Sequence, residues 1–272
     1  MRRVAQYKLA HIALRPFESS PMTPLLRGLP ILVLAGGLAL GASAAELTVS
    51  AAASLTNALR DAAPLFEAAN PSTRLQLNFG SSGALLQQID KGAPVDVFAS
   101  ADQETMNQAQ AKGLVKAQAR RNFVANALVV VVPAASSHTP GAVADLVQAA
   151  YRRIAIGLPA SVPVGRYTKG ALEQAGLWAA VAPKMIGAQN VRQALDYVAR
   201  GEVDAGFVYA TDAALMPEKV KVALTVPTPT PILYPVAPVA ASRNAALAAS
   251  FVDFLMAPQA QAVLSKHGFR KP

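Results

Sequence analysis

Two short turns in the first part of the chain have the composition of anion-binding sites. The first reads AASLTN at residues 52–57, and the second reads FGSSG at residues 79–83. Each follows an extended apolar run and precedes an amphipathic helical pattern, so each places a serine hydroxyl and unpaired backbone N–H groups at a helix start. Helix N-termini bind anions because these N–H groups lack partners and the macrodipole is positive there. Neither turn contains a charged residue or histidine, and together they predict an uncharged oxyanion pocket.

Two further helix starts without charged residues lie later in the chain. Asn190 has the side chain of a helix N-cap, and it leaves the N–H of Val191 free in the first turn. The turn PVG at residues 163–165 precedes a helix predicted over residues 166–176, and it leaves the N–H groups of Val164 and Gly165 available. Each turn alone is ordinary helix capping. Spacing along the chain does not establish that the four turns converge on one pocket.

Signals of enzymatic activity are weak in this sequence. Residues 80–84, GSSGA, resemble the nucleophile elbow of hydrolases, but Ala84 stands where that motif has its final glycine. His138 and His267 have no recognisable catalytic partner. The sequence contains no phosphate-binding loop, dinucleotide fingerprint or metal motif. We therefore expect a protein that is not an enzyme.

The N-terminal residues are typical of a secretory signal peptide. Arg27 precedes a short apolar stretch, residues 29–40, which is followed by the small residues Ala-Ser-Ala. This stretch is too short and too rich in glycine for a transmembrane anchor. We expect residues 1–44 to be removed by cleavage before Ala45, with Met22 as a candidate for the true start. The mature protein is then expected in the periplasm.

Charge and cysteine content narrow the classes of partner. The formal net charge of +9 falls to +5 without residues 1–44, which contain five basic residues and one acid. The remaining basic residues are scattered and not interleaved with aromatic residues, so we expect no nucleic-acid partner. The chain has no cysteine, which excludes disulfides, thiolate metal ligands and a cysteine nucleophile. We expect no cofactor and no direct contact between the protein and a metal ion.

The elements that position these turns follow an alternating pattern. In the first part of the mature chain, strands are predicted at 47–49, 74–79 and 95–99 and helices at 55–66, 84–91 and 103–112. This order indicates a parallel sheet covered by helices. After the β-branched run at 126–133, strands are predicted at 154–157, 205–209 and 234–240 and helices at 166–176, 191–200, 244–256 and 258–267. Residues 227–231, PTPTP, are either a stiff hinge or an ordinary surface loop.

Four segments resemble the signature segments of the periplasmic molybdate-binding proteins of ABC importers, in the same order. They are AAASLTNA at 51–58, GAPVDVFASAD at 92–102, VPVGRY at 162–167 and GFVY at 206–209. The similarity covers residues 46–269. It implies an α/β chain with a type II periplasmic-binding-protein fold, in which two αβ lobes joined by two crossover segments close on a tetrahedral oxyanion. We expect lobe I at 45–125 and 225–272, and lobe II at 126–224.

The same resemblance implies a ligand held by two serines, two backbone N–H groups and one tyrosine hydroxyl. The matching positions are Ser54, Ser82, Val164, Val191 and Tyr209. Four of them are the uncharged helix starts, and Tyr209 ends a predicted strand. Gly83 stands where a serine is common in the family, which leaves open whether Ser81 also contacts the ligand.

The expected function is that of a monomeric periplasmic receptor which delivers molybdate or tungstate to the membrane permease of an ABC importer. A fully ionised MO₄²⁻ accepts hydrogen bonds and donates none, so a pocket without carboxylates disfavours a protonated phosphate. Sulfate has the same charge and shape, and the preference for molybdate rests on the resemblance. A receptor for sulfate, thiosulfate or another tetrahedral oxyanion stays open. The alternatives of other classes are a periplasmic serine hydrolase using Ser82 and an anion-sensing domain acting on a membrane kinase.

Overall fold

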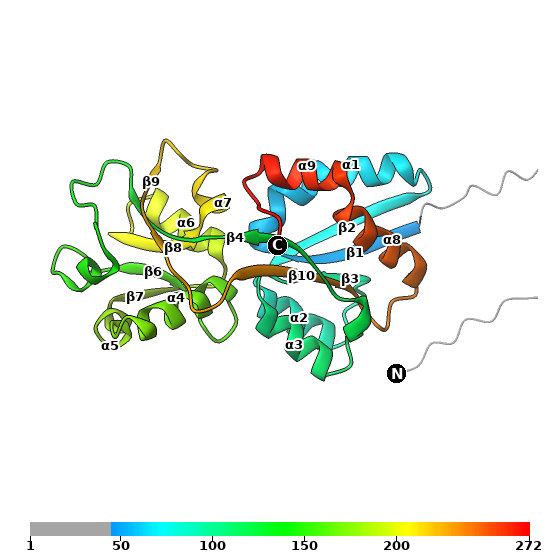
Figure 1. Ribbon diagram of the computed structural model, residues 1–272, viewed down its shortest axis with the longest axis horizontal. Coiled ribbons are helices and arrows are strands. Elements are labelled where there is room, and N and C mark those ends of the chain that lie inside the picture. Colours follow the sequence, from blue (N-terminus) through cyan, green and yellow to red (C-terminus); the bar gives the residue numbers. More distant parts are fainter. Residues whose placement is uncertain (1–44) are drawn as a thin grey trace, which may run out of the picture. The chain divides into compact units, whose positions relative to one another are not determined.

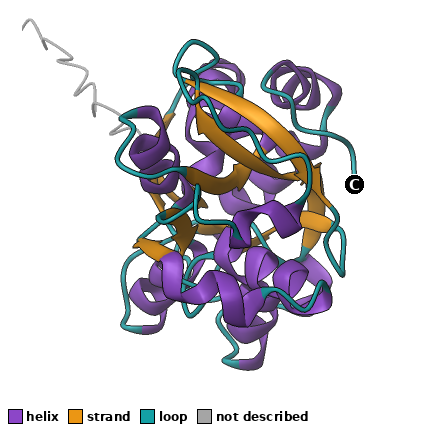
Figure 2. Cartoon of the chain, turned by 90° about the vertical axis from the view of Figure 1, so that its left-hand side faces the viewer, coloured by secondary structure: helices purple, strands orange, loops and turns teal. Residues whose placement is uncertain are grey.

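The computed structural model describes residues 45–272, which form two five-stranded sheets with helices packed on them (Figures 1 and 2). The predicted signal peptide at residues 1–44, with the candidate start at Met22, lies outside the described residues. We call the half built on the first sheet lobe I and the half built on the second sheet lobe II.

Lobe I contains the parallel arrangement predicted for the first part of the chain. Its sheet has the order β2-β1-β3-β10-β4, in which β1 runs parallel to β2 and β3, and β10 runs antiparallel to β3 and β4. The strands are β1 (Ala45–Ala52), β2 (Thr73–Gly80), β3 (Val97–Ala99), β4 (Arg121–Asn126) and β10 (Ile232–Pro238). The helices of this lobe are α1 (Thr56–Ala69), α2 (Ser82–Asp90), α3 (Gln103–Ala111), α8 (Ala245–Met256) and α9 (Pro258–Lys266), and a 3₁₀ turn, η1 (Ala53–Leu55), precedes α1.

Lobe II repeats this plan with a sheet of the order β7-β6-β8-β5-β9. Here β6 runs parallel to β7 and β8, and β5 runs antiparallel to β8 and β9. The strands are β5 (Leu128–Pro133), β6 (Ile154–Gly157), β7 (Met185–Ala188), β8 (Ala205–Tyr209) and β9 (Val220–Val226). The helices are α4 (Pro163–Gln174), α5 (Trp178–Val181), α6 (Val191–Ala199) and α7 (Ala210–Ala213).

Helix α4 begins three residues earlier than the sequence analysis placed it. Pro163 occupies the first helical position, where its fixed φ suits the helix and its missing N–H costs nothing. Val164 and Gly165 therefore belong to the first helical turn and not to a preceding loop. The Gly165 N–H, expected to be available, instead donates to the carbonyl oxygen of Val162 at 3.0 Å. A Cβ at Gly165 would lie 1.9 Å from the carbonyl oxygen of Gly157, so only glycine lets this helix start approach the end of β6 so closely.

The chain crosses between the two sheets twice. It leaves lobe I between Asn126, at the end of β4, and Leu128, at the start of β5. It returns between Val226, at the end of β9, and Ile232, at the start of β10. Because β4 and β10 pair antiparallel, with Ile232 opposite Asn126, the two crossovers lie side by side (Figure 1).

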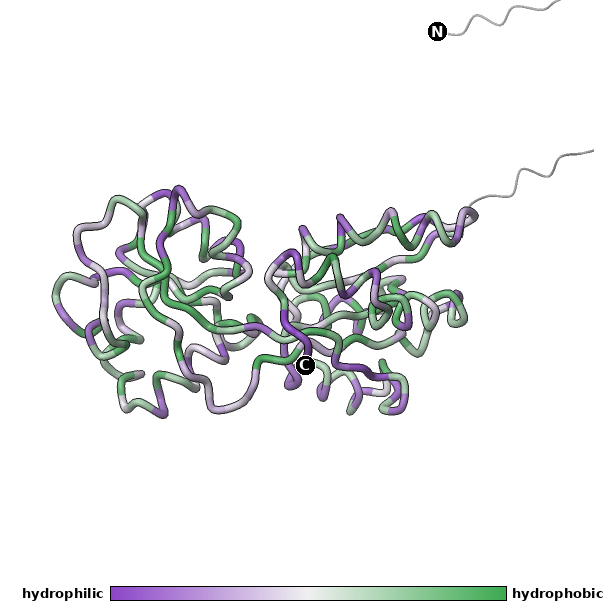
Figure 3. The backbone as a smooth tube through the Cα atoms, turned by 45° about the horizontal axis from the view of Figure 1, so that its top comes forward, coloured by the Kyte–Doolittle hydropathy of each residue, from purple (hydrophilic) through white to green (hydrophobic). Residues whose placement is uncertain are grey.

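The cores of the two lobes are built mainly from the central strands. Strand β5 carries the uninterrupted run Leu128 to Val132, which is buried throughout, as its β-branched composition predicts. Figure 3 shows hydrophobic segments inside each lobe, with hydrophilic residues mostly on outer helices and loops. Within residues 45–272, no single helix has the length and hydropathy of a membrane span; α8 and α9 together pass that test by length and composition, with a 60° bend between them.

Candidate functional site

A cavity lies between the lobes, at the ends of β1, β2 and β8. All five residues predicted from the sequence line it, namely Ser54, Ser82, Val164, Val191 and Tyr209. No Asp, Glu, Lys, Arg or His is among its lining residues. The four helix starts that spacing alone left unconnected therefore meet around one uncharged cavity.

Lobe I contributes serine side chains to the cavity. Ser82 is the first residue of α2 and is fully buried. Its Oγ accepts a hydrogen bond from the N–H of Ala101 at 3.0 Å, and it makes no other hydrogen bond within the described residues. The hydroxyl proton of Ser82 is therefore free to be donated to a ligand.

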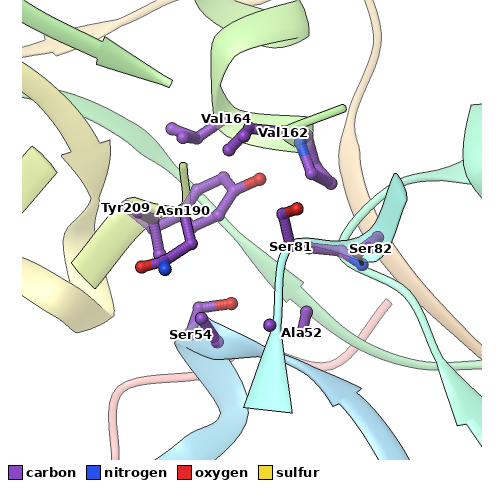
Figure 4. A pocket seen from close by; sticks show the side chains of 13 residues that line it. Ala52, Ser54, Ser81, Ser82, Val162, Val164, Asn190 and Tyr209 are labelled. Carbon is purple, nitrogen blue, oxygen red and sulfur yellow. Dashed lines mark hydrogen bonds between the residues drawn. The ribbon is translucent and has the colours of Figure 1, made fainter. Parts of the chain in front are cut away.

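The second serine of lobe I lies in the 3₁₀ turn that precedes α1. Ser54 Oγ lies 3.0 Å from the phenolic oxygen of Tyr234, a buried side chain of β10 that is not part of the cavity lining. Ser81, which the sequence leaves as a further candidate for contact with the ligand, also lines the cavity. In Figure 4 the hydroxyl groups of Ser54, Ser81 and Tyr209 face the same space, with Val164 on the far side from Ser54.

Lobe II contributes two backbone N–H groups at helix starts. Asn190 caps α6 by accepting a hydrogen bond from the N–H of Gln193 at 3.0 Å, which confirms its predicted capping role. Val191 and Val164 lie in the first turns of α6 and α4, and within residues 45–272 neither N–H has a hydrogen-bond partner. Two unpaired N–H groups and two positive helix ends therefore meet at the cavity.

Tyr209 is the last residue of β8, and its side chain is 1% exposed. Its hydroxyl is buried without a hydrogen-bond partner among the described residues. Burial, reinforced by the neighbouring tyrosines and carboxylates, raises the pKa of Tyr209 well above the ordinary value, so the phenol keeps its proton. An unpartnered buried hydroxyl costs free energy, and a ligand oxygen that accepts its proton would remove this cost.

Two arginines of lobe II bind lobe I close to the cavity. Arg166 of α4 donates from Nε to Asp102 Oδ2 at 2.7 Å and from Nη2 to Thr105 Oγ1 at 2.6 Å. Arg192 of α6 donates to Asn57 Oδ1 at 2.8 Å and to the carbonyl oxygen of Ser54 at 3.2 Å. These contacts join α4 and α6, the two helices whose first turns carry the unpaired N–H groups, to lobe I.

Arg192 also forms an ion pair within its own lobe. Its Nε donates to Asp212 Oδ1 at 2.6 Å, and the Asp212 side chain is fully buried. Burial raises the pKa of the Asp212 carboxyl to about 6, and the Arg192 guanidinium partly opposes this rise. The sequence analysis identified neither arginine, although each follows a predicted N–H donor by one or two positions.

A third contact between the lobes involves the position where this chain differs from the family pattern. The N–H of Gly83 donates to the carbonyl oxygen of Ser161 at 3.0 Å. A Cβ at Gly83 would lie 2.6 Å from that oxygen. A side chain at this position would therefore force the two lobes apart locally.

Neither histidine within residues 45–272 lies at the cavity. His267 Nε2 pairs with Asp61 at 2.8 Å, and His138 lines a separate hollow beside Tyr151. Ser82 thus has no general base beside it in the described structure, and a nucleophilic serine needs one. In the same part of the chain, no group of three or more His, Cys, Asp or Glu side chains could hold a metal ion.

Comparison with known proteins places the chain among solute-binding proteins. The model of the family described as bacterial extracellular solute-binding protein matches residues 47–270. The molybdate-binding protein ModA of Escherichia coli strain K12 is 39% identical over 232 residues, which cover 82% of this chain and 88% of that protein.

Two solved structures extend this comparison. The periplasmic molybdate-binding protein of Azotobacter vinelandii is 25% identical, with a TM-score of 0.72 over 83% of this chain and 99% of its own. The sulfate-binding protein SubI of Mycobacterium tuberculosis H37Rv has the same TM-score of 0.72 at 19% identity, over 84% of this chain and 87% of its own. The second likeness concerns the fold alone, so two-lobed architecture does not by itself distinguish one oxyanion from another.

Proposed function

The chain belongs to the family of bacterial extracellular solute-binding proteins, and we propose that it is the periplasmic receptor that captures molybdate and delivers it to the membrane permease of an ABC importer. As a member of this family it is a binding protein and not an enzyme. The uncharged cavity, lined by hydroxyl groups and by unpaired N–H groups, carries the choice of a fully deprotonated oxyanion, and the similarity to ModA carries the choice of molybdate.

The chemistry of the cavity suits a fully deprotonated tetrahedral dianion. The negative charge would be stabilised by hydrogen bonds and by the positive ends of α2, α4 and α6. Tungstate shares the charge, shape and proton-free state of molybdate, and we propose it as a second ligand.

The proposed ligand donors are the five residues expected from the sequence. They are the hydroxyl groups of Ser54, Ser82 and Tyr209 and the N–H groups of Val164 and Val191. Because each donor is an O–H or N–H group, we propose that the protein touches only the oxygens of the anion and never the metal atom. No cofactor takes part.

We further propose how the chain is organised for this task. The lobes, expected at 45–125 with 225–272 and at 126–224, are bounded by the crossovers that follow Asn126 and Val226, and the protein acts as a monomer after removal of residues 1–44. Because donors come from both lobes, the ligand would bridge them and favour their closure around the two crossovers.

A single calorimetric series tests the proposal. The purified protein is titrated with molybdate, tungstate, sulfate and phosphate, before and after treatment with a chelator. We expect one molybdate per chain, tungstate close behind, negligible phosphate binding and no effect of the chelator. At a ligand concentration near one hundred times Kd, bound molybdate should add about 2.7 kcal/mol to the free energy of unfolding. Heat and thermal stabilisation with sulfate alone would overturn the ligand assignment.

A further inference from the structure

We propose that Tyr234 and Asn126, which lie outside the cavity lining, are positioning residues that fix the Ser54 hydroxyl as a hydrogen-bond donor to the ligand. The inference rests on the proposed function, because it assigns a direction to one of the ligand contacts. It adds two residues that determine what kind of ligand oxygen Ser54 can bind.

The orientation of the Asn126 amide is set by the backbone. Its Oδ1 accepts a hydrogen bond from the N–H of Ala127 at 2.9 Å, which assigns the oxygen to that side. The Nδ2 therefore points the other way and donates to Thr211 Oγ1 at 2.9 Å and to the phenolic oxygen of Tyr234 at 3.2 Å. Both protons of the amide group are thereby used.

The orientation of the Tyr234 hydroxyl follows from that of the amide. An amide nitrogen donates and does not accept, so the Tyr234 proton cannot go to Asn126. The remaining partner among the described residues is Ser54 Oγ, at 3.0 Å. If Ser54 donated to Tyr234 instead, a fully buried phenolic proton would have no acceptor, which costs free energy.

The protonation state of Tyr234 agrees with this direction. Burial raises the pKa of the phenol well above its ordinary value, so the group retains its proton at neutral pH. The ring is held in place by edge contacts with Tyr209, at a centroid distance of 5.8 Å, and with Phe269, at 5.5 Å. The hydroxyl thus has a fixed position from which it donates to Ser54.

The consequence for Ser54 is that its oxygen is already occupied as an acceptor. Within the described residues its own proton has no acceptor, and the residue lines the cavity. Ser82 is in the same situation, because its oxygen accepts from the N–H of Ala101. Both serines are therefore oriented as donors before a ligand arrives, which suits an anion that carries no proton and reduces the cost of ordering the site.

A double-mutant cycle in the full-length protein tests the chain of contacts. Molybdate affinity is measured by calorimetry for the parent, Tyr234→Phe, Ser54→Ala and the double variant. We expect Ser54→Ala to weaken binding about 10- to 100-fold and Tyr234→Phe about 3- to 10-fold. If Tyr234 acts through Ser54, the double variant binds as Ser54→Ala does, within about twofold. The matched control is Tyr151→Phe, a buried tyrosine of lobe II outside the cavity, which should bind like the parent.

A second variant keeps the test decisive if Tyr234→Phe does not fold. Asn126→Asp replaces the amide donor by an acceptor of the same shape, so the Tyr234 proton turns to it and Ser54 loses its orientation. Asn126→Asp should weaken molybdate binding more in the parent background, which has Ser54, than in the Ser54→Ala background. The added negative charge weakens binding in both backgrounds, whereas the loss of Ser54 orientation weakens it only where Ser54 is present. Equal losses in the two backgrounds would overturn the inference.

The outcomes separate this inference from the proposed function. The positioning role is overturned if the losses of affinity in Tyr234→Phe and Ser54→Ala add up in the double variant. It is also overturned if Tyr234→Phe binds molybdate with full affinity. In both cases the proposed binding of molybdate stands. Full affinity in Ser54→Ala overturns both the positioning role and the assignment of Ser54 to the site. If the parent binds another oxyanion in place of molybdate, the proposed ligand fails, and the same cycle with that ion decides the positioning role.

Discussion

The two lobes equip the cavity with donors of different kinds. Lobe I offers hydroxyl groups whose oxygens already accept a hydrogen bond from within the lobe, Ser82 from Ala101 and Ser54 from Tyr234. Lobe II offers backbone N–H groups at helix starts and the Tyr209 hydroxyl, which has no partner in the described structure. The hydroxyl groups of lobe I are thus oriented by contacts within that lobe, whereas the donors of lobe II gain a hydrogen-bond partner when the ligand binds.

The contacts between the lobes are also unequal. Both bridging arginines, Arg166 and Arg192, belong to lobe II, and their partners across the interface, Asp102 and Asn57 among them, belong to lobe I. A ligand that bridges the lobes adds to contacts that already favour their approach. The difference between the lobes therefore predicts which substitutions affect the anion directly and which affect closure.

The largest effects are expected from the prepared hydroxyls of lobe I. Ser82→Ala and Ser54→Ala each remove a donor to a dianion, and such a hydrogen bond contributes roughly 1.5–3 kcal/mol. Molybdate affinity measured by calorimetry should fall about 10- to 100-fold in each. The ligand-free variants should also unfold at a lower temperature than the parent, because each substitution leaves a buried donor without its acceptor, the Ala101 N–H in Ser82→Ala and the Tyr234 hydroxyl in Ser54→Ala. A variant that keeps full affinity would remove its serine from the proposed site.

Tyr209→Phe tests the unsatisfied donor of lobe II. The ring is retained, and the lost hydrogen bond should weaken molybdate binding about tenfold. Unlike the serine substitutions, this change also removes a buried hydroxyl without a partner, so the ligand-free protein should unfold at the same or a higher temperature. Lower stability of the ligand-free variant would show that Tyr209 has a structural partner and would weaken the contrast between the lobes.

Gly83→Ala tests closure without touching a proposed donor side chain. The added Cβ would lie 2.6 Å from the Ser161 carbonyl oxygen and oppose the approach of the lobes. Overpacking of this kind costs about 1 kcal/mol where a neighbour can shift, so affinity should fall about fivefold. Solution scattering should show a smaller decrease in the radius of gyration on adding molybdate than in the parent. An unchanged affinity would mean that the lobes do not need this contact.

Much of this arrangement could be read from local sequence, and the exceptions have physical reasons. Helix starts were found because their N–H groups and capping residues are determined within a few positions, as at Asn190. Strand β9 was missed because it lies at a sheet edge, where exposed and buried residues mix without the apolar run of β5. Strand β7 was missed because it lies at the other edge of that sheet, where Ala188 alone among its four residues is buried.

Contacts between residues far apart in the sequence could not be predicted in this way. Tyr234 meets Ser54 across 180 positions of sequence, and Arg192 meets Asn57 across 135. Such pairs depend on how the lobes and crossovers pack, which leaves no periodic signal along the chain. For the same reason the sequence indicated the donors of the proposed site but neither the residue that orients Ser54 nor those that join the lobes.

Arg166→Gln is expected to have a smaller effect than the loss of a donor. The Arg166–Asp102 pair joins the lobes outside the cavity lining, with the two side chains 21% and 5% exposed, and it supports closure without contacting the anion. Molybdate affinity should fall two- to fivefold, and less at high salt, because the pair is partly screened. A loss as large as that of Ser82→Ala would mean that Arg166 acts on the anion itself.

The smallest effects are expected where the donor is the backbone. Val164→Ala and Val191→Ala shorten side chains that line the cavity but leave each N–H at its helix start. Molybdate affinity should therefore change by no more than about twofold, well below the loss of a hydrogen bond to a charged group. Val191→Ala should lower the unfolding temperature, because it removes part of the buried apolar face of α6. If either valine variant lost as much affinity as Ser54→Ala, backbone donation at helix starts would be the wrong description of lobe II.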